Sequence, residues 1–295
     1  MSLAKLTHYL NPITAYARQR SPLAFTLGLA LALFSAGMQH GDISGLLFLR
    51  GWLSMSLLLF LIRLSDDLCD IPVDKLKHPE RLLCLPDAPL RQIHIARLAL
   101  ALLLLLLQLP NLQALVFCAL SLASFAVFFR LKPKLPTLVH VSLLNASLGL
   151  FPLYAALWLH QHIGPAALWM ALFFTLGGIA HDLSHSVPDE ARPRTPGSHG
   201  ELEQLKPALL AYLALAAFVL AALAGFQLYR LQLAGLAFAS TLGLMLAVVL
   251  VLALRLIAKP CEARAKPFYV LGFAFFLLPG LVQVVSVNVL TLFNF

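Results

Sequence analysis

Charged residues are scarce in this sequence of 295 residues. Asp, Glu, Lys and Arg make up only 12% of the chain, whereas hydrophobic residues make up 60%. A soluble domain of this size needs more charge to cover its surface, so the composition predicts that lipid is part of the solvent. A spanning helix needs about 20 mostly apolar residues, which leaves room for eight or nine spans and little else. We therefore predict a single membrane domain over residues 1–295.

The sequence also lacks the features of a disulfide-rich, zinc-binding or cleaved secreted protein. It has four cysteines, none of them in a CxxC pair, and this predicts free thiols. The first 21 residues have no long apolar core, so they do not resemble a cleaved signal peptide. They carry Lys5, Arg18 and Arg20, and we predict that residues 1–21 form a cytoplasmic arm at the membrane interface.

What the chain does have is a series of long apolar runs. These runs are too long and too continuous for barrel strands, which need roughly 10 residues of alternation. A helix satisfies its backbone polar groups within the segment, as lipid requires. We predict an all-α polytopic membrane protein of about nine spans, near residues 22–40, 45–65, 92–109, 111–130, 136–159, 165–182, 207–227, 231–256 and 267–292.

The positive charges divide unevenly between the two membrane faces. On the nine-span assignment, 19 of the 21 Lys and Arg residues lie on one face, and only Arg50 and Arg230 lie on the other. Short positive loops stay in the cytoplasm, so we expect a cytoplasmic N-terminus, with a bacterial inner membrane as the location. Because the cations lie in loops between apolar segments, the net charge of +8 does not indicate a nucleic-acid partner. The cytoplasmic segments are 1–21, 63–97, 130–134, 192–206 and 255–266.

The acidic residues follow the same division. Twelve of the 13 lie on the cytoplasmic face, and Asp42 is the exception. Since acids contribute little to membrane topology, insertion did not require this placement, and we expect function at the cytoplasmic ends of the helices. No Asp or Glu is predicted in the middle of a span, where transporters place their ionisable residues.

The first acidic cluster follows the second predicted span. Asp66, Asp70 and Asp74 are spaced i, i+4 and i+8, and Asp67 shares the face of the last two. Pro72 predicts that the helix ends or kinks nearby. Like charges at this spacing repel, whereas magnesium takes one or two carboxylates together with phosphate oxygens and water. The spacing favours a magnesium bridge to a diphosphate, although a solvated helix end with surface acids is the plainer alternative.

The second cluster ends the sixth predicted span. Asp182, His185 and Asp189 repeat the i, i+3, i+7 pattern with histidine in the middle. Neutral His185 can ligate a metal, and charged His185 can donate to a phosphate. We predict that segments 66–91 and 183–206 are cytoplasmic loops over an active site. The second of them is either a lid or a plain connector.

These residues resemble the UbiA superfamily of intramembrane prenyltransferases, most strongly over residues 45–210. That family has an Asn-Asp-x-x-Asp-x-x-x-Asp motif after its second helix and Asp-x-x-Asp-x-x-x-Asp after its sixth. Here Asp66 stands in place of the asparagine and His185 in place of an aspartate. The matching positions are Asp67, Asp70, Asp74, Pro79, Arg81, Asp182 and Asp189, together with the aromatic and basic stretch at 129–134.

The resemblance implies a helical bundle with a central cavity open to the cytoplasm, in which Mg²⁺ binds the diphosphate of an isoprenoid donor. Ionisation of the donor leaves an allylic cation, which a lipophilic acceptor attacks. Asn145 and His185 are candidates for substrate contact, but Asn145 would equally suit a hydrogen bond between helices. The implied ion-carrying catalytic residues are Asp66, Asp67, Asp70, Asp74, Asp182 and Asp189. The implied diphosphate-binding residues are Arg63, Arg81, Lys132, Lys134 and Arg194.

Three classes of function remain open at this point. The first is a prenyltransferase with an aromatic or other lipophilic acceptor. The second is a UbiA-like terpene cyclase acting on a prenyl diphosphate alone, which the altered second motif keeps open. The third is a membrane transporter or cation-binding protein without enzymatic activity, which the absence of mid-span acids disfavours.

Overall fold

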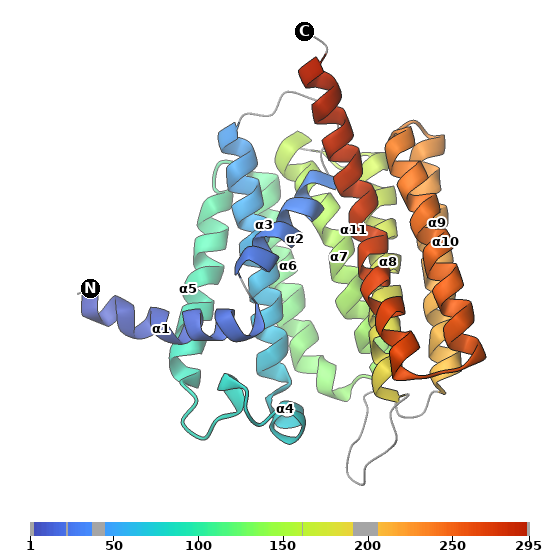
Figure 1. The fold of residues 1–295 in the computed structure, drawn as a ribbon. Helices are drawn as coiled ribbons and strands as arrows, with labels where there is room; N and C mark the ends of the chain where they lie inside the picture. The colour runs from blue at the N-terminus through green and yellow to red at the C-terminus, as the bar shows by residue number, and fades with distance from the viewer. Residues whose placement is uncertain (1–2, 22, 37–44, 161, 191–205, 294–295) are drawn as a thin grey trace. The chain divides into compact units, whose positions relative to one another are not determined.

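The structure is a computed structural model that describes residues 3–21, 23–36, 45–160, 162–190 and 206–293 (Figure 1). These residues form α-helices and two short 3₁₀ helices, and no strand occurs among them. The elements are α1 (Leu3–Arg20), α2 (Leu23–Ala36), α3 (Gly45–Cys69), α4 (Ile71–Lys77), η1 (Leu82–Cys84), α5 (Leu90–Gln108), α6 (Leu112–Leu131), η2 (Lys132–Lys134), α7 (Thr137–His160), α8 (Pro165–Glu190), α9 (Pro207–Arg230), α10 (Leu236–Ala258) and α11 (Glu262–Phe293).

Eight of these helices are long and apolar enough to cross a membrane, namely α3 and α5 to α11. They correspond to eight of the nine predicted spans, and the prediction of an all-α polytopic membrane protein is confirmed. The remaining predicted span, 22–40, coincides in part with α2. That helix is described for only 14 residues, most of them apolar, and residues 37–40 lie outside the described part of the chain.

The chain divides into two compact units. The first unit comprises residues 1–31, 42–135 and 157–161, and the second comprises 32–41, 136–156 and 162–295. Each unit therefore contains one of the two acidic clusters predicted from the sequence.

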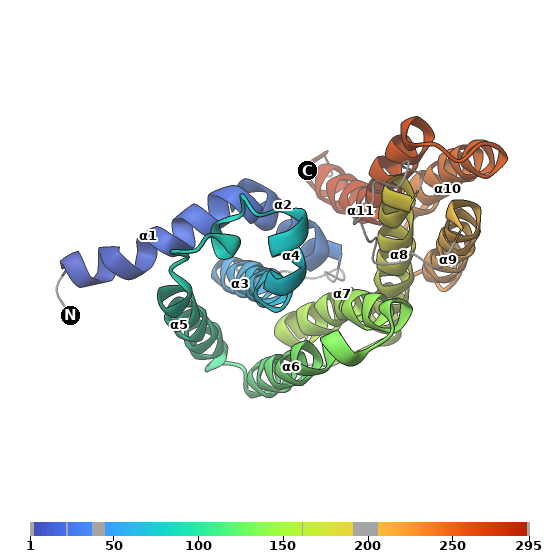
Figure 2. The same ribbon diagram turned by 90° about the horizontal axis from the view of Figure 1, so that it is seen from below.

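In the first unit, α3 packs against α5 and α6, and α5 packs against both α1 and α6. Figure 1 shows α1 running across α5, and Figure 2 views these helices from the end that carries α4. Tyr16 of α1 is fully buried in a small core with Leu64, Leu83 and Ile93. Its ring meets Phe60 edge to face, with centroids 5.8 Å apart. The core holds the end of the N-terminal helix against the end of α3.

Helical geometry continues through the first acidic cluster. Helix α3 extends to Cys69, four residues beyond the predicted end of the span, and α4 follows after Asp70. The backbone N–H of Asp70 donates to the carbonyl of Asp66, and that of Asp74 donates to the carbonyl of Asp70. Pro72 lies in the first turn of α4, where its missing N–H costs no intrahelical bond. The start of segment 66–91, predicted as a loop, is therefore helical.

In the second unit, α8 packs against α9 and α11, and α10 packs against the same two helices. An aromatic cluster fills the space between them. Phe173 lies with its ring centroid 5.8 Å from that of Phe238 and 6.1 Å from that of Phe275. Helix α8 continues to Glu190, so residues 183–190 of the predicted loop 183–206 are helical. Residues 191–205 of that loop lie outside the described residues.

Candidate functional site

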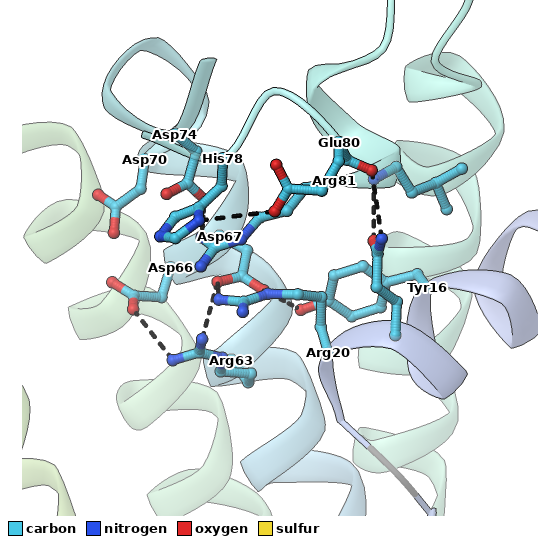
Figure 3. A network of polar contacts seen from close by, with 12 residues as sticks. Tyr16, Arg20, Arg63, Asp66, Asp67, Asp70, Asp74, His78, Glu80 and Arg81 are labelled. Carbon is cyan, nitrogen blue, oxygen red and sulfur yellow. Dashed lines mark hydrogen bonds and ion pairs between the residues drawn. The ribbon is translucent and has the colours of Figure 1, made fainter. Parts of the chain in front are cut away.

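The carboxylate of Asp67 is almost completely buried, with 4% of its side chain exposed, and both of its oxygens have partners. Tyr16 donates its hydroxyl to Oδ2 at 2.8 Å. Arg20 donates to both oxygens at 2.9 Å, in a bidentate arrangement (Figure 3). Arg63 adds an ion pair at 3.2 Å. Because Tyr16 and Arg20 belong to α1, this carboxylate ties the N-terminal helix to α3.

The surroundings of this anchor keep its donors protonated. Burial, together with the negative charge of Asp67, raises the pKa of the Tyr16 phenol well above its usual value. The hydrogen bond to Asp67 likewise raises the pKa of the Arg20 guanidinium. The shifts further favour the protonated forms, in which both groups donate hydrogen bonds to Asp67.

The carboxylates of Asp66 and Asp70 converge on one cation. The ammonium of Lys132 donates to Asp66 Oδ1 at 2.5 Å. It also donates to both oxygens of Asp70, at 2.7 and 2.8 Å. From the sequence we expected that these acids repel one another. We also expected that Lys132 binds a phosphate group. In the structure the lysine side chain itself offsets the repulsion, because η2 brings it back to the end of α3.

Asp74 is paired in a similar way. Arg81 donates to its Oδ2 at 2.5 Å across the turn that joins α4 to η1, and both side chains are largely buried. Lys134, another predicted diphosphate-binding residue, is exposed at the end of η2. Arg194 lies outside the described residues. In total, the four aspartates of the first cluster face four cationic side chains: Arg20, Arg63, Arg81 and Lys132.

In the first cluster, the carboxylates of Asp66 and Asp70 have an arrangement that fits Mg²⁺. Among the described residues, no three His, Cys, Asp or Glu side chains gather into a ready-made metal site. Magnesium, however, is usually bound by one or two carboxylates plus phosphate oxygens and water. Asp66 and Asp70, one helical turn apart, already direct their oxygens at a shared positive charge and fit this pattern. Asp67 does not fit it, since arginine and tyrosine donors occupy its oxygens.

In the second unit, Asp182 is held by Asn145. The amide Nδ2 of Asn145 donates to Asp182 Oδ2 at 2.5 Å and to the carbonyl of Val141 at 2.8 Å. Asn145 is buried, with 6% of its surface exposed. It therefore makes the hydrogen bond between helices that was its alternative role, and it orients the aspartate of the second motif. The side chain of Asp189, within α8, lies outside the described part of the structure.

Gly178 permits this contact between α7 and α8. A Cβ atom at this position would lie 2.8 Å from Asn145 Oδ1 and 2.5 Å from Leu148 Cδ1. We expect Gly178→Ala to destabilise the protein by about 1–3 kcal/mol, because the crowded helices must separate. Thermal unfolding in detergent measures the effect. Gly243→Ala is the matched control, because the new Cβ meets only Phe226 at 3.8 Å. A Gly178→Ala variant as stable as Gly243→Ala would contradict the prediction.

Next to Asp182, an aromatic set surrounds His181. Its ring stacks on Tyr269 with centroids 5.0 Å apart and lies 5.0 Å from Phe273 and 6.0 Å from Phe276. His185 is exposed and meets Tyr269 edge-on at 4.8 Å. Sequence reasoning did not find this set, because an aromatic residue in a span has no feature that separates it from lipid contact.

Comparison with solved structures shows a likeness to a digeranylgeranylglyceryl phosphate synthase in membranes. The two chains superpose with a TM-score of 0.66 at 16% sequence identity, over 94% of this chain and 99% of that one. No protein-family model matches the sequence, and no curated protein matches it. At this identity the likeness concerns the fold. The chain therefore shares its fold with that synthase, and such an all-helical membrane fold is what the resemblance of its motifs to the UbiA superfamily led us to expect.

Proposed function

We propose that the protein is a Mg²⁺-dependent intramembrane prenyltransferase. It transfers an isoprenoid chain from a prenyl diphosphate to an aromatic or other lipophilic acceptor. The observation that carries the proposal is the convergence of Asp66 and Asp70 on the Lys132 ammonium, at 2.5–2.8 Å. It occurs at the end of a spanning helix, in a chain with the fold of such enzymes.

The chain's own residues supply most of what diphosphate departure requires. Magnesium, when held by Asp66 and Asp70, would neutralise charge on the leaving diphosphate. Lys132, once displaced from the two carboxylates, would donate to a phosphate oxygen, and so would exposed Lys134 in the same turn. Arg81 is held by Asp74 and would donate through its remaining N–H groups.

The second cluster serves the same reaction in this proposal. Asp182, oriented by Asn145, would carry a further ion together with Asp189, and Arg194 would contact the diphosphate. The rings of Tyr269, Phe273 and Phe276 offer faces that attract a positive charge. Apolar helices around the prenyl chain would exclude water from the allylic cation.

The proposal is tested by supplying the purified protein with prenyl diphosphates of several lengths. Each donor is given with and without a panel of aromatic and lipid acceptors. We expect one pyrophosphate released per prenylated product detected by mass spectrometry, with an absolute need for acceptor. EDTA should stop turnover and added Mg²⁺ should restore it. A cyclic hydrocarbon or alcohol formed without acceptor would identify a terpene cyclase instead. A lack of pyrophosphate release from every donor would contradict an enzyme.

The charge distribution supports a cytoplasmic orientation for this chemistry. We propose that the N-terminus and the acidic ends of α3 and α8 face the cytoplasm, because 19 of the 21 Lys and Arg residues lie on that side of the nine-span assignment. The orientation is measured by replacing Asp87 with a single reactive cysteine and labelling it in intact cells and in opened cells. Labelling of this cysteine by an impermeant reagent in intact cells would show that the orientation is opposite to the one proposed.

A further inference from the structure

A groove of about 420 Å³ lies in the first unit between α3, α5 and α6. This volume is within the usual range of small-molecule pockets, about 300–1,000 Å³. Its walls are mainly aliphatic and aromatic, and include Leu98 and Ala101 of α5 and Leu122 and Phe125 of α6. Leu98 is 65% exposed, so the groove opens on the surface of spanning helices, where lipid is the solvent.

One end of the groove is basic. His94 and Arg97 line it from the first turns of α5, and Arg130 lines it from the last turn of α6. Neither arginine forms an ion pair with an acid of the described residues, in contrast to Arg20, Arg63 and Arg81. From this end, the lining becomes apolar over about two helical turns of α5, towards Ala101. The groove is therefore amphipathic along its length.

We propose that this groove binds an anionic phospholipid of the bilayer. The phosphate lies between Arg97 and Arg130, which donate charge-assisted hydrogen bonds to its oxygens. One acyl chain runs along Leu98, Leu122 and Phe125. Basic pockets between spanning helices are a known type of site for anionic headgroups. This binding does not depend on the proposed enzymatic activity.

The site shares a helix turn with the acidic cluster. Ser65, Leu68 and Cys69 of α3 form one wall of the groove, and Asp66 and Asp70 lie within the same turns. The thiol of Cys69 donates to the carbonyl of Phe129 at 3.4 Å, which joins α3 to α6 between two residues that line the groove. A lipid seated here packs against the helix end that positions the two carboxylates.

Native mass spectrometry of the delipidated full-length protein tests the proposal. The protein is given equimolar phosphatidylglycerol and phosphatidylcholine with identical acyl chains. We expect phosphatidylglycerol adducts to dominate in the wild type. The double variant R97Q/R130Q should bind this lipid roughly 10- to 30-fold more weakly. The double variant R91Q/R255Q is the matched control, because both arginines are exposed and neither lines the groove. It should keep the preference.

A second pair of variants fills the groove without changing charge. Ala126→Trp places a large ring in the groove and should reduce retention of the lipid. Ala123→Trp, on an exposed part of the same helix that does not line the groove, should not. Equal affinity of wild type and R97Q/R130Q, or no preference between the two lipids, would overturn the proposal. Displacement of the lipid by inorganic pyrophosphate would assign the arginines to a soluble anion instead.

Discussion

Replacement of Asp70 by asparagine is expected to lower turnover by about 10²–10³-fold, while the protein still folds and inserts. This is the size of effect seen when one group that stabilises transition-state charge is removed. Asp70 Oδ1 and Oδ2 both accept hydrogen bonds from the Lys132 ammonium, at the position proposed for Mg²⁺. Its side chain is 28% exposed, so water can solvate the new amide and little stability should be lost. The rate of pyrophosphate release at saturating donor and Mg²⁺ measures the effect.

Asp87→Asn is the control for this prediction. Asp87 is an exposed acid between η1 and α5, and its substitution changes the net charge by the same amount. The turnover of the Asp87→Asn variant should stay within about twofold of the wild type, because surface substitutions away from structural features change stability by only about 0.5 kcal/mol or less. Equal turnover in Asp70→Asn and Asp87→Asn would refute the assignment of Asp70 as a carrier of the diphosphate's counter-ion.

Long apolar runs were sufficient to predict most of the fold, and helical periodicity predicted one feature of the site. Long apolar runs can satisfy their backbone in lipid only as helices, and eight of the nine predicted spans are helices of spanning length. The i, i+4 spacing placed Asp66 and Asp70 on one face, where they converge on one cation. The two alternatives at Pro72, a stop or a kink, could not be separated by sequence, because proline is tolerated in a first helical turn.

The partners of the aspartates could not be predicted from this sequence. Arg20 is 47 residues from Asp67, and Lys132 is 62 residues from Asp70. Helical periodicity relates residues three or four positions apart, but it does not say which side chain another segment brings alongside. As a result, the sequence predicted a divalent cation at these four acids but did not predict the arginine and lysine side chains with which the structure pairs them. The hydrogen bond of Asn145 to another helix was one of the two roles predicted for this residue, because buried amides in spanning helices tend to bond to a neighbouring helix.

The same pairings give Asp67 a structural role that differs from the proposed metal-binding role of Asp66 and Asp70, and this difference can be measured. Asp67→Ala is expected to destabilise the protein by about 3 kcal/mol, because it leaves Arg20 and Tyr16 buried without their acceptor. Loss of one partner of a buried ion pair costs about 3–5 kcal/mol. The lower end applies here, since Arg63 is 44% exposed and can turn to water. The loss should be seen as a lower midpoint of thermal unfolding, together with faster proteolysis of α1, whose end this carboxylate secures.

Tyr16→Phe and Asp70→Ala complete the comparison. Tyr16→Phe removes one donor to Asp67 and retains the ring that packs on Phe60, so it should lower stability by about 1.5–3 kcal/mol, the value of a hydrogen bond to a charged group. Asp70→Ala should lower turnover with little change in unfolding. If Asp67→Ala kept wild-type stability and lost turnover as Asp70→Ala does, the anchor assignment would fail. Asp67 would then have to bind the metal together with Asp66 and Asp70, after release from Arg20.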